Sequence, residues 1–376
     1  MTTMQSSSPI QQLHALGQSI WYDNIERRLL LNGGLARLVA DGDIRGLTSN
    51  PSIFHNAIAR SQDYDNELRQ LAAGGCSAEE IYEALAIADI QAAADLLRPL
   101  YDQTQGADGY VSLEVSPYLA HDADGTLQAA KRLWQAVARP NLMIKIPATL
   151  EGLGAIRAAI ASDLNVNVTL IFSISRYRKV MDAYLSGLED RLAQGKALDG
   201  IASVASFFLS RIDTKVDKRL DALAAAQPQK AEQAAGLHGK LAIASARAAY
   251  AAFRETFGGP RFARLSAAGA RLQRPLWAST STKNPAYPDT LYIDNLIGPD
   301  TVNTLPPVAL DAFRDHGKAA LSIDIDLAGT QAAIEDLGAL GISLDEVTAE
   351  LEAEGVQAFA QAYTDLLKAI TLKMEK

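Results

Sequence analysis

The segment "LMIKIPA" (residues 142–148) has the pattern of a buried β-strand that contains one charged residue. Leu142, Ile144 and Ile146 share one face of such a strand, because successive side chains point to opposite sides. Lys145 lies on the other face. A buried ammonium without a partner is costly and usually loses its proton. The segment therefore predicts either a lysine at the edge of the protein or a lysine whose neutral form is needed.

Segments of the same character recur along the chain, separated by longer helical patterns. We expect eight strands, at residues 19–25, 45–52, 109–115, 142–148, 165–172, 201–209, 274–280 and 300–305. Strands that alternate with helices favour a parallel α/β fold, and eight such units favour a closed barrel over an open sheet. We find no repeat, linker or break in composition. The sequence thus predicts one domain, residues 1–376, with a (β/α)8 TIM barrel and additional N- and C-terminal helices.

Helix signals accompany the predicted strands. Ser77 followed by Glu80 forms a capping box, and the helix that it opens is expected to end at Pro99. A second capping box, Ser343 followed by Glu346, opens a C-terminal helical extension from about residue 343. We expect this extension to have a structural role. The alternative is that it closes the mouth of the barrel.

Composition and charge exclude several classes of function. The chain has 376 residues, of which 48% are hydrophobic and 21% charged, so it can bury a large core. Its formal net charge is −9, and no run of Lys and Arg suits a nucleic acid or an anionic membrane. Cys76 is the only cysteine, which excludes an internal disulfide. No apolar run approaches the roughly 18 residues of a membrane span. We expect a cytoplasmic protein with no nucleic-acid or membrane partner.

Polar residues share a face on several of the predicted strands. These residues are Asp23, Thr48, Asn50, Ser112, Glu114, Ser116, Lys145, Asn165, Asn167, Thr169 and Ser206. For any one of them, a structural hydrogen bond is the more common explanation, because buried polar groups need partners. Together they lie near the C-terminal ends of consecutive strands, where barrel enzymes build their active sites. The set therefore indicates an active site.

Lys145 suggests two kinds of chemistry in such a site. As a cation it could bind a phosphate or a developing negative charge, and as a neutral amine it could attack a carbonyl and form a Schiff base. Aliphatic surroundings favour the neutral amine, whereas contact with Asp23 or Glu114 favours the ammonium. Schiff-base chemistry also needs two acid/base groups, one for water and one for a substrate hydroxyl. The two carboxylates and the lysine supply that minimum set.

Eight segments in order, from residue 19 to residue 307, resemble the transaldolases in their longer bacterial form. They read "SIWYDNIERRLL", "GLTSNPSIF", "SLEVSP", "MIKIPATLEG", "NVNVTLIFS", "ASVASFFLSRID", "LWASTSTKNPAY" and "DTVNTLPP". The resemblance implies a (β/α)8 barrel of the Schiff-base class I aldolase superfamily, acting in the pentose phosphate pathway. It implies transfer of a dihydroxyacetone unit from sedoheptulose 7-phosphate or fructose 6-phosphate to glyceraldehyde 3-phosphate or erythrose 4-phosphate. It implies no cofactor and no metal.

The resemblance also implies a role for each matching position. Lys145 would be the Schiff-base nucleophile, Asp23 the acid/base for the donor's C4 hydroxyl, and Glu114 with Thr169 the pair that positions water. Asn50, Asn167 and Ser206 would hold the hydroxyls of the three-carbon unit, and Arg211 the phosphate. Shorter transaldolases have a phosphate-binding arginine just after the seventh strand, where this chain reads "ASTSTKNP". We expect Lys283, with Ser279 or Ser281, to take its place, and the register stays open.

Two other functions compete with transfer. A Schiff-base aldolase of the fructose-6-phosphate type would release free dihydroxyacetone, but those relatives have a tyrosine and a glutamine in place of the two carboxylates. A non-catalytic sugar-phosphate-binding barrel would have lost the lysine or an acid. Asp23, Glu114 and Lys145 are all present, which favours transfer. The expected partners are sugar-phosphate substrates, and the chain is expected to be a monomer or a homodimer.

Overall fold

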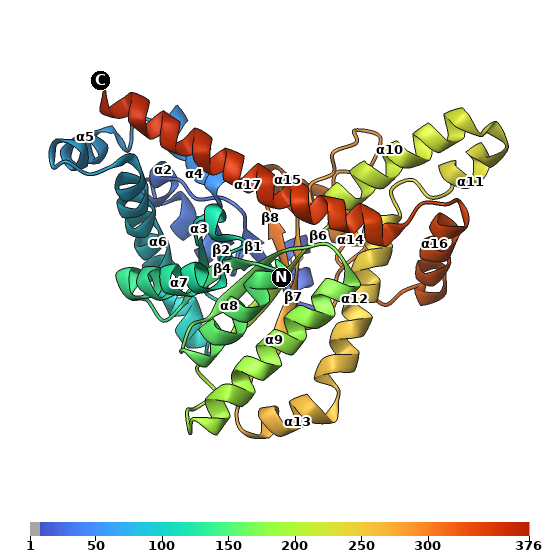
Figure 1. The fold of residues 1–376 in the computed structure, drawn as a ribbon, viewed down its shortest axis with the longest axis horizontal. Coiled ribbons are helices and arrows are strands. Elements are labelled where there is room, and N and C mark those ends of the chain that lie inside the picture. Colours follow the sequence, from blue (N-terminus) through green and yellow to red (C-terminus); the bar gives the residue numbers. More distant parts are fainter. Residues whose placement is uncertain (1–7, 376) are drawn as a thin grey trace, which may run out of the picture.

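The computed structural model describes residues 8–375, and within them eight parallel strands form one closed barrel in chain order (Figure 1). The expected α/β class and the barrel are confirmed. The strands are Gln18–Tyr22 (β1), Gly46–Thr48 (β2), Tyr110–Glu114 (β3), Leu142–Pro147 (β4), Val166–Ile171 (β5), Ser203–Phe208 (β6), Gln273–Ala278 (β7) and Thr301–Leu305 (β8).

Helices follow the strands and surround the barrel. They are Pro9–Ala15 (α1), Arg27–Leu31 (α2), Gly34–Ala40 (α3), Pro51–Arg60 (α4), Asp65–Ala73 (α5), Ala78–Gln103 (α6), Ala123–Val137 (α7), Leu150–Ala161 (α8), Ile174–Ala193 (α9), Ser210–Ala226 (α10), Ala231–Ala235 (α11), Leu241–Phe257 (α12), Pro260–Ala267 (α13), Leu291–Asp294 (α14), Pro307–His316 (α15), Leu327–Ala339 (α16) and Leu344–Met374 (α17). Short 3-10 helices lie at Pro117–Leu119 (η1) and Pro228–Lys230 (η2).

The first two strands are shorter than expected. β1 ends at Tyr22, so Asp23 follows the strand instead of lying within it. β2 ends at Thr48, because the next residues already belong to the start of α4. There the side chain of Asn50 accepts a hydrogen bond from the backbone N–H of Ile53, which caps the helix and ends the strand.

The helix signals were partly right. Ser77 and Glu80 form the expected reciprocal capping box at the start of α6. The expected end at Pro99 was wrong, since α6 continues to Gln103. A proline this close to a helix end removes one backbone hydrogen bond, and the burial of Leu97 keeps this last part of the helix on the core. At α17 only half of the expected box is present, in which Ser343 accepts from the backbone N–H of Glu346.

The register of the barrel brings the charged residues level with one another. Glu114 at the end of β3 pairs with Lys145 in β4, and Lys145 pairs with Asn167 in β5. Beyond this level the β5–β6 register shifts, and Leu170 adopts a positive φ of 60°. Such a bulge changes the direction of neighbouring side chains and is common next to active sites. The barrel thus presents these polar residues at the C-terminal ends of its strands.

The C-terminal helix α17 crosses the molecule. In Figure 1 it is the long red helix that runs from beside α4 and α5 at one end to α10 and α16 at the other. A Cβ atom on Gly355 would lie only 3.0 Å from Leu170, so the helix approaches the end of β5 closely. Arg176 forms an ion pair with Glu352 of this helix at 3.1 Å. The helix therefore lies over the C-terminal ends of the strands.

Candidate active site

Lys145 lies inside the barrel and not at the edge of the protein. Only 5% of the residue is exposed. Its Nζ donates a hydrogen bond to the backbone oxygen of Ser49 at 3.0 Å and lies 3.6 Å from Oε2 of Glu114. The ring of Phe359 is 6.0 Å from the same nitrogen. The amine thus has one carboxylate and one carbonyl near it, with an aromatic ring above.

Asp23 is the first of two carboxylates near the amine, and it comes directly after β1. Its Oδ1 accepts a hydrogen bond from the hydroxyl of Thr48 at 2.7 Å. Burial raises the pKa of Asp23, while the charge of Lys145 and the Thr48 hydrogen bond act in the opposite direction. A carboxylate with a raised pKa binds a proton more readily than one in water, as a catalytic base must.

Glu114 is the second carboxylate, and 7% of the residue is exposed. Burial raises its pKa to about 7, against the effect of the Lys145 charge. Its Oε2 is buried and finds no hydrogen-bond partner among residues 8–375, and the same holds for the hydroxyl of Thr169. Glu114 lines a side cavity of about 240 Å³, together with Tyr82 and Tyr363. Buried polar atoms without partners are typical of groups that bind water or substrate.

A chain of hydrogen bonds joins three strands below the lysine. Ser206 donates to Oδ1 of Asn167 at 2.7 Å, and Nδ2 of Asn167 donates to the hydroxyl of Ser112 at 3.1 Å. All three residues are buried. The side chains are thereby held in fixed orientations, as groups that orient a polyhydroxy ligand need to be. Asn50 uses its side-chain oxygen to cap α4, which leaves its amide nitrogen as the donor.

Arg211 and Lys283 bring positive charge to the same cleft. Arg211 lies in the first turn of α10, with its guanidinium 5.6 Å from the ring of Phe208. Burial lowers the pKa of Arg211, as expected for a desolvated cation. Lys283 lies in the loop after β7. Neither cation forms an ion pair with a carboxylate in the described part of the chain, so both can bind an anionic ligand.

The predicted site residues come together in one place. All of them except Glu114 line a single cleft of about 270 Å³ at the C-terminal ends of the strands. The members are Asp23, Asn50, Lys145, Asn167, Thr169, Ser206, Arg211, Ser279, Ser281 and Lys283. Ser279 has a positive φ of 56°, and its hydroxyl lies 2.8 Å from that of Ser210. Lysine, acid and cations therefore face one small space.

The sequence did not identify every residue that lines the cleft. Phe208, Thr304 and Phe359 also border it. Thr304 lies on β8, where the alternation that marked the other strands could have found it. Phe359 comes from α17, and no pattern in a helix of the C-terminal region shows that it meets the lysine.

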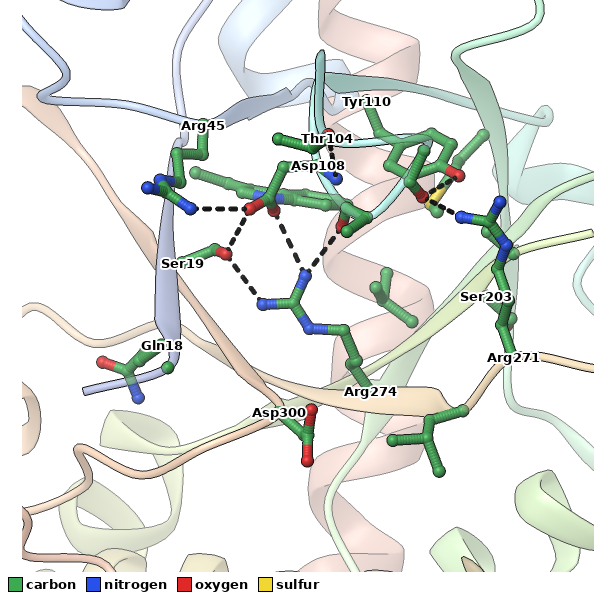
Figure 2. A pocket seen from close by; sticks show the side chains of 18 of the residues that line it. Gln18, Ser19, Arg45, Thr104, Asp108, Tyr110, Ser203, Arg271, Arg274 and Asp300 are labelled. Atoms are coloured by element: carbon green, nitrogen blue, oxygen red, sulfur yellow. Dashed lines mark hydrogen bonds and ion pairs between the residues drawn. The ribbon is translucent and has the colours of Figure 1, made fainter. Parts of the chain in front are cut away.

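The largest of these cavities, about 550 Å³, lies at the opposite end of the barrel (Figure 2). There Asp108 accepts from Ser19 at 2.7 Å and from Arg274 at 3.1 Å, with Arg45 at 3.4 Å. Arg271 lies apart from this cluster in Figure 2 and donates to the backbone oxygens of Gly106 at 2.5 Å and Gln105 at 2.8 Å. These charged groups therefore already have hydrogen-bond or ion-pair partners. By volume alone, this cavity would be the better candidate for an active site. The reactive groups, however, lie in the smaller cleft at the C-terminal ends of the strands.

Two further features concern ligands and membranes. Within residues 8–375 we find no group of three or more His, Cys, Asp or Glu side chains that could hold a metal ion. None of the helices in the same range combines the length and the apolar character needed to cross a membrane.

Residues 20–370 match a family model described as transaldolase/fructose-6-phosphate aldolase. A transaldolase of Thermobifida fusca is 49% identical over 368 residues, which are 98% of this chain and 98% of the relative. One of Saccharopolyspora erythraea is 47% identical over 374 residues, covering 99% and 100%. One of Mycolicibacterium smegmatis is 46% identical over 367 residues, covering 97% of each.

Proposed function

The chain belongs to the transaldolase/fructose-6-phosphate aldolase family, and on that premise we propose that its C-terminal cleft carries out transaldolase chemistry. The enzyme transfers a dihydroxyacetone unit from sedoheptulose 7-phosphate or fructose 6-phosphate to glyceraldehyde 3-phosphate or erythrose 4-phosphate. One observation carries the assignment of the site. A buried lysine lies 3.6 Å from a carboxylate, and the cleft that it faces also holds a second carboxylate and two cations that have no ion-pair partner among residues 8–375.

The reaction begins at the amine of Lys145. Its nitrogen attacks the C2 carbonyl of the ketose, and the carbonyl oxygen takes up a proton from solvent to give a carbinolamine. Loss of water then forms the iminium. Glu114, with a pKa of about 7, accepts the proton that the amine releases and returns it to the departing hydroxyl. Thr169 has a free hydroxyl with which to hold that water.

Carbon–carbon cleavage depends on Asp23. Its carboxylate takes the proton of the C4 hydroxyl, the C3–C4 bond breaks, and the electron pair moves into the iminium to form an enamine. An aldose phosphate leaves. The enamine carbon then attacks the aldehyde carbon of the acceptor, and Asp23 gives its proton to the new hydroxyl. Water hydrolyses the product imine, and Lys145 is free again.

The remaining polar residues hold the substrate during these steps. We assign the hydroxyls of the three-carbon unit to Asn167 and Ser206. Hydrogen bonds already hold these side chains in fixed orientations, so they lose little conformational entropy when the substrate binds. Arg211 and Lys283 are placed to bind the phosphate, with the guanidinium as a planar donor and the ammonium as a point charge.

The test is a product analysis with and without an acceptor. With fructose 6-phosphate and erythrose 4-phosphate, we expect glyceraldehyde 3-phosphate and sedoheptulose 7-phosphate in equal amounts. Steady release of dihydroxyacetone from fructose 6-phosphate alone would favour the aldolase, and no turnover in either case would favour the non-catalytic barrel. Lys145→Met is the control, since it keeps the volume of the side chain and removes the nucleophile.

A further inference from the structure

The loop between β7 and α14, residues 279–290, brings Ser279, Ser281 and Lys283 into the cleft. Residues 283–286 are exposed. The loop is fixed near its start by the buried hydroxyl of Thr280, which donates to the backbone oxygen of Thr304 at 2.8 Å. What holds its far end decides where Lys283 stands.

Two tyrosines at the far end bind to α10. Tyr287 donates to Oδ2 of Asp217 at 2.6 Å, and Tyr292 donates to Oδ2 of Asp213 at 2.9 Å. Near the start of the loop, the hydroxyl of Ser279 meets that of Ser210, which is also on α10. Positions 210, 213 and 217 lie on one face of a helix, because they are three and four residues apart. One face of α10 therefore holds the loop at three points.

The two aspartates are themselves fixed from the other side. Oδ1 of Asp217 accepts from the backbone N–H of Gly239 at 3.1 Å, and Oδ1 of Asp213 accepts from that of Ala242 at 2.8 Å. Gly239 has a positive φ of 68°, and a Cβ atom there would lie 2.9 Å from the ring of Tyr287. The turn before α12 thus supports both the carboxylate and the ring.

We propose that Asp217 and Tyr287 are positioning residues for the phosphate of the substrate. This inference rests on the proposed function, because it takes Arg211 and Lys283 as the phosphate-binding pair. Arg211 belongs to the first turn of α10, and Lys283 lies between the anchors at Thr280 and Tyr287. The hydrogen bond between Tyr287 and Asp217 sets the distance between the two cations, although neither residue lines the cleft.

The direct test is calorimetric titration of the full chain with inorganic phosphate. We expect Tyr287→Phe to raise the dissociation constant about tenfold or more, the effect of losing one hydrogen bond to a charged group. Tyr250→Phe is the matched control, because it also removes one tyrosine hydroxyl. That hydroxyl donates to the backbone oxygen of Pro299, and the next residue, Asp300, lines the cavity at the opposite end of the barrel. That variant should bind phosphate as the wild type does.

Kinetics separate positioning from general loss of structure. Tyr287→Phe should raise KM for fructose 6-phosphate with kcat close to the wild-type value. Its rate of imine formation with dihydroxyacetone, which has no phosphate, should be unchanged. Asp217→Asn keeps an acceptor oxygen for the tyrosine and should retain most of the phosphate affinity.

Three results would overturn the proposal. They are an unchanged phosphate affinity in Tyr287→Phe, an equal rise in Tyr250→Phe, and an equal loss of imine formation with dihydroxyacetone. Failure of the proposed function gives a different result, since the wild type would then form no adduct on Lys145 with fructose 6-phosphate. Phosphate titration does not depend on catalysis and still decides the role of Tyr287 in that case.

Discussion

At Lys145, a buried amine stands beside a buried carboxylate. Its Nζ lies 3.6 Å from Oε2 of Glu114 and donates to the backbone oxygen of Ser49 at 3.0 Å. A buried pair of this kind contributes little to stability, because desolvation of both groups offsets their attraction. In the proposed reaction the pair acts by proton exchange between the amine and the carboxylate. The fold tolerates this polar interior at the end of the barrel where the chemistry takes place.

Glu114 should control the pH dependence of the reaction. Its pKa is raised from 4.5 to about 7, so the carboxylate that accepts the proton of the amine forms only as the pH rises through about 7. We expect kcat/KM for fructose 6-phosphate to rise with pH across this range. Glu114→Gln should lower kcat by about a hundredfold or more and remove the inflection. An unchanged inflection in that variant would assign it to another group.

The sequence indicated the proposed catalytic residues more directly than the proposed binding residues. Alternation along strands identified Lys145, Asp23 and Glu114, because a polar side chain on a buried strand face is unusual. Arg211 and Lys283 lie in a helix and a loop, where no such alternation applies, and only the family resemblance indicated them. Phe359 was missed altogether, since its approach to the lysine depends on how α17 crosses the barrel.

At the scale of elements, α17 does more than pack against the barrel. Its ion pairs with α9 and α10 are structural, yet Phe359 also borders the cleft above the lysine. The enamine formed after cleavage must be kept from water until the acceptor arrives. The aromatic ring is placed to exclude that water. This would be the closure of the barrel mouth that the sequence offered as the alternative to a structural role, and it stays a prediction.

Removal of the Phe359 ring should let the intermediate leak. We expect Phe359→Ala to increase the release of dihydroxyacetone from fructose 6-phosphate in the absence of an acceptor, relative to the rate of transfer. Leu372→Ala is the control on the same helix, because Leu372 is 61% exposed and does not line the cleft. Equal ratios of release to transfer in the two variants would exclude this role for the ring.

The elements themselves were more predictable than their ends. Period-two alternation marked several strands of the barrel, because each has one face on the helices and one in the interior. The ends depended on local contacts that alternation does not report. The Asn50 cap shortened β2, and the packing of Leu97 carried α6 past Pro99.

For the molecule as a whole, the two ends of the barrel have different tasks. Within residues 8–375, the C-terminal end holds two buried oxygens without a hydrogen-bond partner, on Glu114 and Thr169, whereas the N-terminal end holds charges that bind one another (Figure 2). Asp108 is the centre of the second group and is 3% exposed. Besides Arg274, Arg45 and Ser19, it accepts from the indole nitrogen of Trp21 at 3.3 Å. We infer that the interactions at this end stabilise the fold.

Asp108→Ala should destabilise the fold without changing the chemistry. It leaves two guanidinium groups without their carboxylate, which we expect to cost about 3–5 kcal/mol of unfolding free energy and to lower the thermal midpoint by several degrees. Below that midpoint kcat should stay close to the wild-type value. Asp300→Asn is the matched control, since Asp300 borders the same cavity but is exposed, and asparagine tolerates its positive φ of 58°. Equal stability of the two variants would contradict this division of tasks.

The central claim is that Lys145 forms a Schiff base with the donor. Incubation with fructose 6-phosphate and borohydride, followed by digestion and peptide mass analysis, tests it directly. We expect one stable adduct of a reduced three-carbon or six-carbon unit, on the peptide that contains Lys145, and none in Lys145→Met. An unmodified Lys145 in the wild type, or an adduct that persists in the variant, would contradict the account.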